Sequence, residues 1–236
     1  MRLIFIRHGD PDYVNDCLTE KGRREAALLA ERVKGWDVTD FYVSPLGRAQ
    51  ETADYSLKAC GRTAETLDWL REFSGTVPSC EEHNKNIPWD MNPTVWADKE
   101  EFYDRNKWYK TEFMQRGDVE EKVKWVQDGI DGLLAKYGYI HENGMFTVKE
   151  HKDDTVVFFC HFAVSMVIIG HLLGISAVNM WHGFNLSPTS VTVLGCEERQ
   201  GDVGFFRCHV MGCTKHLAAG GEPISNSGYF TEIFQK

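Results

Sequence analysis

The chain has 236 residues, of which 42% are hydrophobic and 26% charged. These values are typical of a globular protein with a sizeable core, and they exclude disordered and collagen-like chains. The 26 lysines and arginines are outnumbered by 35 aspartates and glutamates, which gives a net charge of -9. So acidic a chain is a poor candidate for general binding to nucleic acid or to anionic membranes. Any anion that it binds must be held by a local cluster of basic side chains.

The cysteines and the apolar runs indicate a cytoplasmic protein. Seven cysteines form no paired framework, and the apolar run at 3–6 is too short for a signal peptide. The longest apolar stretch, 156–175, is long enough to span a bilayer but carries His161, Ser165 and His171. We therefore expect free thiols, and we interpret the stretch as a buried strand followed by a buried helix rather than a membrane span.

Strands and helices alternate in the predicted structure. Apolar periodicity and end signals predict, in chain order, a strand at 3–6, a helix at 19–33 capped by Thr19, a strand at 41–43, a helix at about 46–59, a helix at 119–136, a strand at 155–160, a helix at 163–173, and paired strands at 191–194 and 203–210. This order predicts a layered α/β/α fold with a largely parallel central sheet, formed by one domain over residues 1–236.

The segment 76–117 differs from its surroundings. It contains prolines, tryptophans, tyrosines and many acidic residues, and it lacks the continuous apolar runs of a core strand. We expect an inserted cap over the catalytic edge of the sheet that helps to choose the substrate.

Basic residues follow three of the predicted strands. Arg7 and His8 come after the first strand, Ser44 and Arg48 after the second, and His161 after the buried strand. Ligand sites of α/β sheets lie beyond the carboxyl ends of parallel strands. An acidic protein that collects two arginines and two histidines at this edge is expected to bind a phosphate-like dianion.

This set of residues suits phosphoryl transfer. A neutral imidazole such as His8 is a nucleophile toward phosphorus, and Arg7 and Arg48 offer forked donors to the phosphoryl oxygens. His161, at a helix N-terminus, adds a donor where the backbone already favours anions. The positive charge is supplied by side chains, so we expect no metal or other cofactor.

The leaving oxygen still needs an acid. Glu72 follows a helix and a further predicted strand, which places it at the same edge. Acidic residues are common in this region, so Glu65, Glu81 and Glu82 are alternatives.

Five separate pieces of the sequence resemble the histidine phosphatase superfamily, the phosphoglycerate mutase-like proteins. They are Arg7-His8-Gly9, the runs 18–22 and 44–53, Cys160-His161 and the run 185–191. The resemblance implies that His8 becomes transiently phosphorylated, and that Glu72 protonates the leaving group and then helps to activate water. The residues that it implies to bind the phosphoryl group are Arg7, Arg48, His161 and Asn15.

The chain departs from the family pattern in places that bear on activity. The runs 10–16 and 71–75 lack the mutase patterns, which favours a phosphatase that acts on a small phosphorylated metabolite. A phosphoglycerate mutase-type isomerase remains an alternative. Phe162 stands where the family has glycine beside the second histidine, so a non-catalytic phosphate-binding module is a further alternative.

The remaining histidines and cysteines carry no predicted chemistry. The spacing of the C-terminal ones, Cys208, His209, Cys213 and His216, matches no strong zinc-ligand pattern. No role is predicted for the others, which are His141, His151, His171 and His182.

Overall fold

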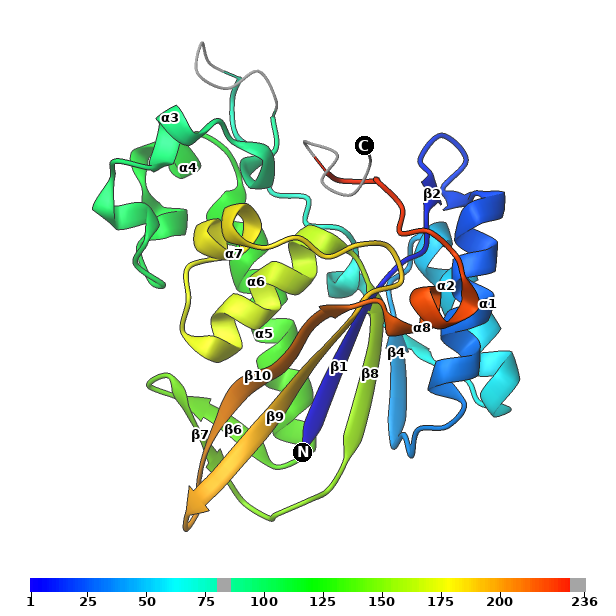
Figure 1. Cartoon of the computed structure of the whole chain (residues 1–236). Coiled ribbons are helices and arrows are strands. Elements are labelled where there is room, and N and C mark those ends of the chain that lie inside the picture. The colour runs from blue at the N-terminus through cyan, green and yellow to red at the C-terminus, as the bar shows by residue number, and fades with distance from the viewer. Residues whose placement is uncertain (80–85, 230–236) are drawn as a thin grey trace.

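The computed structural model describes residues 1–79 and 86–229, and it shows a mixed sheet of eight strands with helices on both faces (Figure 1). The strand order is β5-β4-β8-β1-β9-β10-β7-β6. The strands are β1 (Arg2–Arg7), β4 (Asp40–Val43), β5 (Glu65–Thr66), β6 (Tyr139–Glu142), β7 (Met145–Val148), β8 (Thr155–Cys160), β9 (Val191–Gln200) and β10 (Val203–Cys213). A separate two-stranded sheet joins β2 (Pro11–Asp12) to β3 (Cys17–Leu18).

The first four strands in this order are parallel, and they position the site. β5, β4, β8 and β1 pair in parallel, whereas β9, β10, β7 and β6 are joined by antiparallel pairings. The predicted α/β fold with a parallel core is therefore confirmed. Because β1, β4 and β8 run in one direction, their carboxyl ends meet at one edge of the sheet, which lies at the top of Figure 1.

Alternate residues of the central strands face two helical layers. Leu3 and Phe5 of β1 pack in one apolar cluster with α5 (Val119–Lys136), α6 (Phe162–Leu173) and α7 (Ala177–Gly183). Ile4 and Ile6 pack in the second cluster, with α1 (Glu20–Val33) and α2 (Gly47–Cys60). Burial on both faces explains why β1 and β8 are continuous apolar runs instead of alternating ones.

The helix ends follow their sequence signals. Thr19 caps α1 by accepting a hydrogen bond from the Gly22 amide at 3.0 Å, and α2 and α6 end at glycines, Gly61 and Gly174, in the left-handed conformation. Within 1–79 and 86–229, no helix combines the length and the apolar character needed to cross a bilayer.

The described part of the segment 76–117 consists of short helical turns. They are η2 (Pro88–Asp90), α3 (Pro93–Trp96), η3 (Glu100–Phe102), η4 (Trp108–Lys110) and α4 (Glu112–Gln115). Phe102 and Met114 join the apolar cluster of α5 to α7, and Trp108 packs edge-on against Trp181 with ring centroids 5.1 Å apart. Some of its aromatic residues therefore belong to the core.

Several elements have no counterpart in the predicted set. β6 and β7 form a hairpin whose turn residues, Asn143 and Gly144, both have positive φ. Asn-Gly is a strong signal for such a turn, but each strand is too short for a clear period-two pattern. The short helices α7 and α8 (Lys215–Gly220) and the 3-10 turn η1 (Asp68–Leu70) were also not predicted.

Candidate active site

Three strand ends bring the predicted histidines together. In the parallel ladders Arg7 pairs with Cys160 and Val43 pairs with Phe159, so the residues that follow each strand stand at about the same level. The imidazole rings of His8 and His161 have centroids 5.1 Å apart.

The geometry of His8 prepares one ring nitrogen for attack. His8 is 1% exposed, and its Nδ1 lies 2.7 Å from the Gly9 carbonyl oxygen. This contact assigns the proton to Nδ1 and leaves a lone pair on Nε2. Burial, together with the nearby Arg7 guanidinium, holds the pKa of His8 well below its ordinary value. The ring is therefore neutral and nucleophilic at neutral pH.

His161 is oriented as a hydrogen-bond donor. The Ser44 hydroxyl lies 2.7 Å from His161 Nε2 and also accepts a hydrogen bond from the Leu46 amide at 3.2 Å. The bond from Leu46 occupies one lone pair of the hydroxyl and leaves its proton available to Nε2. With the hydroxyl as donor, the ring proton of His161 lies on Nδ1. That nitrogen is buried and has no partner among the described residues. Burial, followed by the proximity of His8, lowers the pKa of His161.

Arg7 and Arg48 are both largely buried, at 5% and 9% exposure. Arg7 donates to the carbonyl oxygens of Leu186 at 2.5 Å and Ser227 at 3.2 Å. The Nε atoms of both arginines are buried without a partner among the described residues. An unsatisfied buried donor costs about 1–3 kcal/mol, so an anion that binds here gains two donors that the fold leaves unused.

The carboxyl group of Glu72 lies against the N-terminus of α6, the helix that begins directly after His161. Its Oε1 accepts hydrogen bonds from the amides of Ala163 at 2.9 Å, Val164 at 3.1 Å and its own neighbour Phe73 at 2.9 Å. Burial outweighs these bonds and raises the pKa of Glu72. A carboxyl group that holds its proton near the two arginines of the site is suited to act as a general acid.

The rival acids are placed differently. Glu65 is exposed on β5, at the outer edge of the sheet, and Glu81 and Glu82 lie outside the described residues. The geometry therefore favours Glu72 over Glu65.

Asn15 and Asp16 occupy the turn between β2 and β3. The Asn15 amide nitrogen donates to Asp12 Oδ2 at 2.7 Å in an exposed turn, so the structure bonds Asn15 to a carboxylate. Asp16, for which no role was predicted, accepts from Arg48 Nη1 at 2.6 Å and from the Gly47 amide at 2.7 Å. A Cβ at Gly47 would lie 2.2 Å from the Asp16 carbonyl oxygen, which explains the glycine in the run 44–53.

The run 18–22 supports the loop after His8. A Cβ at Gly22 would lie 2.2 Å from the Asp10 carbonyl oxygen, so only glycine permits this approach. Thr19 Oγ1 donates to the Asp10 carboxylate at 2.7 Å, and Glu25 Oε2 accepts from the Asp10 amide at 2.9 Å. Burial raises the pKa of Glu25 to about 7. Thr52 of α2 completes the support by accepting from the Gly9 amide at 2.9 Å.

The C-terminal segment also reaches the site. Ser225 donates to Asp10, the Ser227 carbonyl accepts from Arg7, and the Tyr229 hydroxyl lies 2.9 Å from that of Ser187. No sequence motif predicted the contacts of Ser225 and Ser227, because they join residues more than 200 positions apart.

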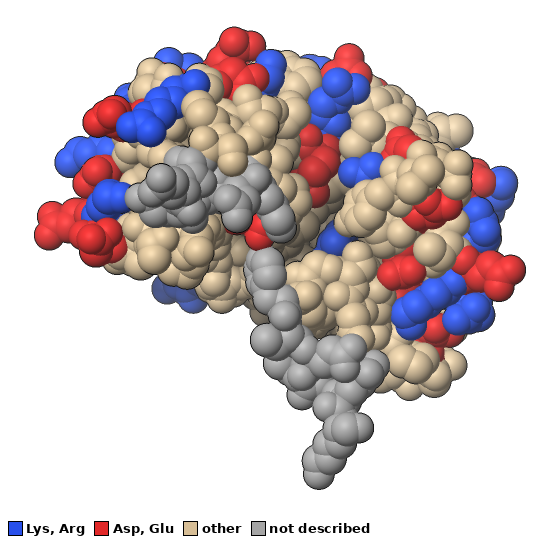
Figure 2. Space-filling model, turned by 90° about the horizontal axis from the view of Figure 1, so that it is seen from above, with Lys and Arg blue, Asp and Glu red and all other residues tan. Residues whose placement is uncertain are grey.

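Charges of both signs lie on the face seen from above. Figure 2 shows lysine and arginine side chains interspersed with aspartate and glutamate on this face, with no broad patch of one sign. The positive charge for an anion therefore comes from the buried arginines.

The C-terminal histidines and cysteines do not form a cluster. Cys213 and His216 contact Arg32, and the His209 ring lies against Gly195. Within the described residues, the group of metal-ligating side chains found close together is Asp131, His141 and His171.

The comparison with family models identifies the family. The model of the histidine phosphatase superfamily (branch 1) matches residues 3–136 and 140–208. A probable phosphoglycerate mutase GpmB of Yersinia pestis (strain Pestoides F) is 46% identical over 83 residues, which are 31% of this chain and 39% of that protein. The chain thus spans about two fifths of the length of the curated relatives it matches.

Solved structures share the fold. A phosphoserine phosphatase mutant from Entamoeba histolytica, in complex with phosphoserine, has a TM-score of 0.56 at 21% identity and covers 92% of this chain and 98% of its own. A mycobacterial glucosyl-3-phosphoglycerate phosphatase has a TM-score of 0.58 at 20% identity, and the match covers 89% of this chain and 98% of that one. The alpha-ribazole phosphatase from Shigella flexneri has a TM-score of 0.58 at 17% identity, and the match covers 91% of this chain and 97% of that one.

Proposed function

The chain belongs to the histidine phosphatase superfamily, and from that premise we propose that it is a metal-independent phosphomonoesterase that acts on a small phosphorylated metabolite through a phosphohistidine at His8. The observation that carries this proposal is the state of the two facing histidines. His8 presents an unprotonated Nε2, and the Nδ1 of His161, buried without a partner among the described residues, carries the ring proton when Ser44 donates to Nε2.

The first half-reaction forms the phosphohistidine. His8 Nε2 attacks phosphorus, the P–O ester bond breaks, and Glu72 gives its proton to the departing oxygen. In the second half-reaction Glu72 accepts a proton from water, whose oxygen attacks phosphorus. The N–P bond then breaks, which releases inorganic phosphate and regenerates His8 and protonated Glu72.

Charge on the phosphoryl group is balanced by fixed donors. Arg7 and Arg48 supply two positive charges and the unused Nε–H groups, and His161 Nδ1–H supplies a neutral donor. Preorganised donors of this kind stabilise a phosphoryl transition state without rearrangement. We retain Asn15 as a phosphate ligand only as a prediction, one that requires its side chain to leave Asp12.

Two other functions are separated by one product assay. The curated relatives are named as probable phosphoglycerate mutases, and a mutase would return the phosphoryl group to its substrate. In a non-catalytic binding module, Phe162 would have abolished catalysis while phosphate binding remained. The centroid of its ring lies 5.9 Å from the Arg7 guanidinium carbon. We expect stoichiometric release of inorganic phosphate from p-nitrophenyl phosphate and from a panel of phosphorylated metabolites.

The intermediate is tested by rapid quenching. Enzyme mixed with ³²P-labelled substrate should yield an acid-labile, alkali-stable label on the protein, and His8→Ala should yield none. His151→Ala, which changes an exposed histidine, is the matched control and should keep the label. Isomerisation without phosphate release would replace our proposal with the mutase, and binding without turnover would replace it with the binding module.

The segment 76–117 is proposed as the cap that chooses the substrate. Its Trp89 lies edge-on to Phe162 at 6.4 Å between ring centroids, whereas Trp96 stacks on His182 at 4.7 Å. Trp89→Ala should therefore change the ranking of substrates in kcat/KM while p-nitrophenyl phosphate hydrolysis is largely kept. Trp125→Ala, on the outer face of α5, is the control. An unchanged ranking would reduce the segment to scaffolding.

A cytoplasmic location is part of the same proposal, supported by the free thiols of the described cysteines.

A further inference from the structure

A second group of chemically active side chains lies away from His8. Asp131 of α5, His141 of β6 and His171 of α6 converge, and their side chains are 32%, 12% and 15% exposed. His141 Nδ1 and His171 Nε2 are 3.1 Å apart, and each lies between 2.9 and 3.2 Å from both Asp131 carboxylate oxygens.

Each arrangement of protons in this triangle leaves one unfavourable contact. Protons on both nitrogens would set two N–H bonds side by side, 3.1 Å apart. A proton on only one nitrogen is shared between the carboxylate and the other imidazole, whose lone pair still faces the carboxylate. A cation between the three groups turns each of these lone pairs into a ligand bond.

The spacing fits a tetrahedral transition-metal ion. Ligand atoms about 2.0–2.1 Å from a four-coordinate zinc lie about 3.3 Å from one another, so the observed triangle is close to one face of such a tetrahedron. Imidazole nitrogen and carboxylate oxygen are both ligands that zinc accepts. Phe146 holds one of the rings in place, because it stacks on His141 with a centroid distance of 4.5 Å.

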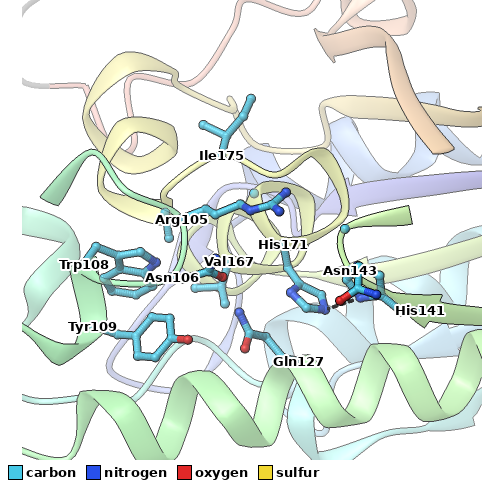
Figure 3. A pocket seen from close by; sticks show the side chains of 13 residues that line it. Arg105, Asn106, Trp108, Tyr109, Gln127, His141, Asn143, Val167, His171 and Ile175 are labelled. Carbon is cyan, nitrogen blue, oxygen red and sulfur yellow. Dashed lines mark hydrogen bonds between the residues drawn. The ribbon is translucent and has the colours of Figure 1, made fainter. Parts of the chain in front are cut away.

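Two of the three ligand residues also line a cavity, from which a fourth ligand can approach. The cavity has a volume of about 420 Å³ and is lined by His141 and His171 together with Arg105, Tyr109 and Gln127. Figure 3 shows His141, His171 and Asn143 at one side of it and Trp108 and Tyr109 at the other. Gln127 lies one helical turn before Asp131 on α5. Three protein ligands and an accessible fourth position are typical of zinc sites that keep a water or a ligand.

This cavity is separate from the proposed catalytic edge. His161 precedes α6 and His171 lies in its last turn, so ten residues of helix place them about 15 Å apart along the axis. Neither His8 nor either buried arginine lines the cavity.

From this geometry we propose that Asp131, His141 and His171 bind one zinc ion, with water in the fourth position facing the cavity. The ion would tie α5, the β6–β7 hairpin and α6 together.

Cobalt is the spectroscopic probe for this site. The full-length chain, free of any affinity tag, reduced and stripped with a chelator, is titrated with Co²⁺. We expect one equivalent to give the visible absorption of four-coordinate cobalt with nitrogen and oxygen ligands, without a thiolate charge-transfer band. Zn²⁺ should displace the cobalt and raise the melting temperature by about 5 °C at saturation.

Variants assign the ligands. Loss of groups that merely orient ligands costs about 10–100-fold in metal affinity, so Asp131→Asn and His171→Gln should each weaken Co²⁺ binding by about 100-fold or more. His151→Gln should bind as the parent does. Circular dichroism checks that each variant is folded, and X-ray absorption of the zinc-loaded parent should show two imidazoles and no sulfur.

Absence of a saturable cobalt spectrum would overturn the proposal. So would sulfur in the zinc coordination shell, or unchanged affinity in both folded ligand variants. Phosphatase activity is not among these readouts, so the proposal fails or stands independently of the function proposed for His8.

Discussion

The two ends of helix α6 carry two proposed sites that arise in different ways. At its N-terminal end, His161 and Glu72 lie near His8 and the two buried arginines. Each of these histidines and arginines ends a strand, follows one or lies in the first turn of a helix. At its C-terminal end, His171 meets Asp131 and His141, which come from a helix face and a short hairpin. The difference teaches that sites at parallel strand ends can be located from sequence, whereas sites formed by packed faces cannot.

The physical reason is the direction of the strands. Parallel neighbours must end at the same edge, so residues that follow β1, β4 and β8 are neighbours whatever their separation in sequence. No such rule relates position 131 to 141 or 171. Their meeting depends on how α5 rotates against α6 and on where the hairpin docks.

The largest effect is expected from removal of the proposed nucleophile, His8. His8→Ala should reduce kcat for p-nitrophenyl phosphate by about 10⁴-fold or more, because the covalent route is lost. Cobalt binding at the other end of α6 should be unchanged. Steady-state kinetics and cobalt titration on one preparation check both statements. Retention of most of the activity would remove His8 from the mechanism.

Glu72→Gln should lower kcat by less than His8→Ala does, and the size of the loss should depend on the leaving group of the substrate. The amide oxygen can still accept from Ala163 and Val164, so the start of α6 is kept while the proton is lost. We expect about 10²–10⁴-fold lower kcat for an alkyl phosphate and a much smaller loss for p-nitrophenyl phosphate, whose phenolate leaves largely unaided. Equal losses for both substrates would assign the acid to another group.

Ser44→Ala should have an effect of about 10-fold on kcat/KM. The hydroxyl orients His161 through its Nε2, and its loss removes one hydrogen bond worth about 1 kcal/mol and frees the tautomer. The prediction is checked by kcat/KM with Ser56→Ala as control, since Ser56 is a buried serine of α2. Equal effects in the two variants would reduce Ser44 to a packing role.

The pH profile should be bell-shaped, with limbs that belong to two residues. His8 must be neutral, and since burial lowers its pKa, kcat/KM should fall only when the pH drops below that lowered value. Glu72 must be protonated, and since burial raises its pKa, activity should fall as the pH rises through that raised value. Glu72→Gln should lose the alkaline limb and keep the acidic one. Its comparison with the parent on one substrate cancels the titration of the substrate itself.

The smallest expected effect is that of metal removal. If the two ends of α6 work independently, chelator-treated enzyme and enzyme loaded with one equivalent of zinc should differ by less than about two-fold in kcat/KM, because arginines supply the positive charge at His8. Complete loss of activity on chelation, restored by a divalent ion, would contradict the metal-independent mechanism and show that the ends are coupled.

Much of the fold was predictable, and the misses have physical causes. The helices at 119–136 and 163–173 were predicted nearly to their observed ends, because the apolar periodicity of the first and the terminal glycine of the second reflect local forces. The β6–β7 hairpin had a local signal in Asn143-Gly144, yet its short strands are stabilised by pairing with β10. No role was predicted for His141, because its position beside Asp131 and His171 depends on that strand pairing.

The proposed catalytic edge also has parts that were predictable from the sequence and parts that were not. Arg7, His8, Arg48 and His161 could be located from strand ends and a family resemblance. The clamp of Asp16 on Arg48 and the approach of Ser227 to Arg7 could not, because they depend on contacts across 32 and 220 positions.

By itself the sequence determined the α/β alternation, the parallel core and the basic edge, since apolar period, helix caps and strand direction act over a few residues. Only the tertiary structure decided the protonated nitrogen of each histidine, the raised pKa of Glu72 and the meeting of Asp131 with His141 and His171. Burial and hydrogen-bond geometry are properties of the packed chain, and they appear only when distant segments exclude water from the same space.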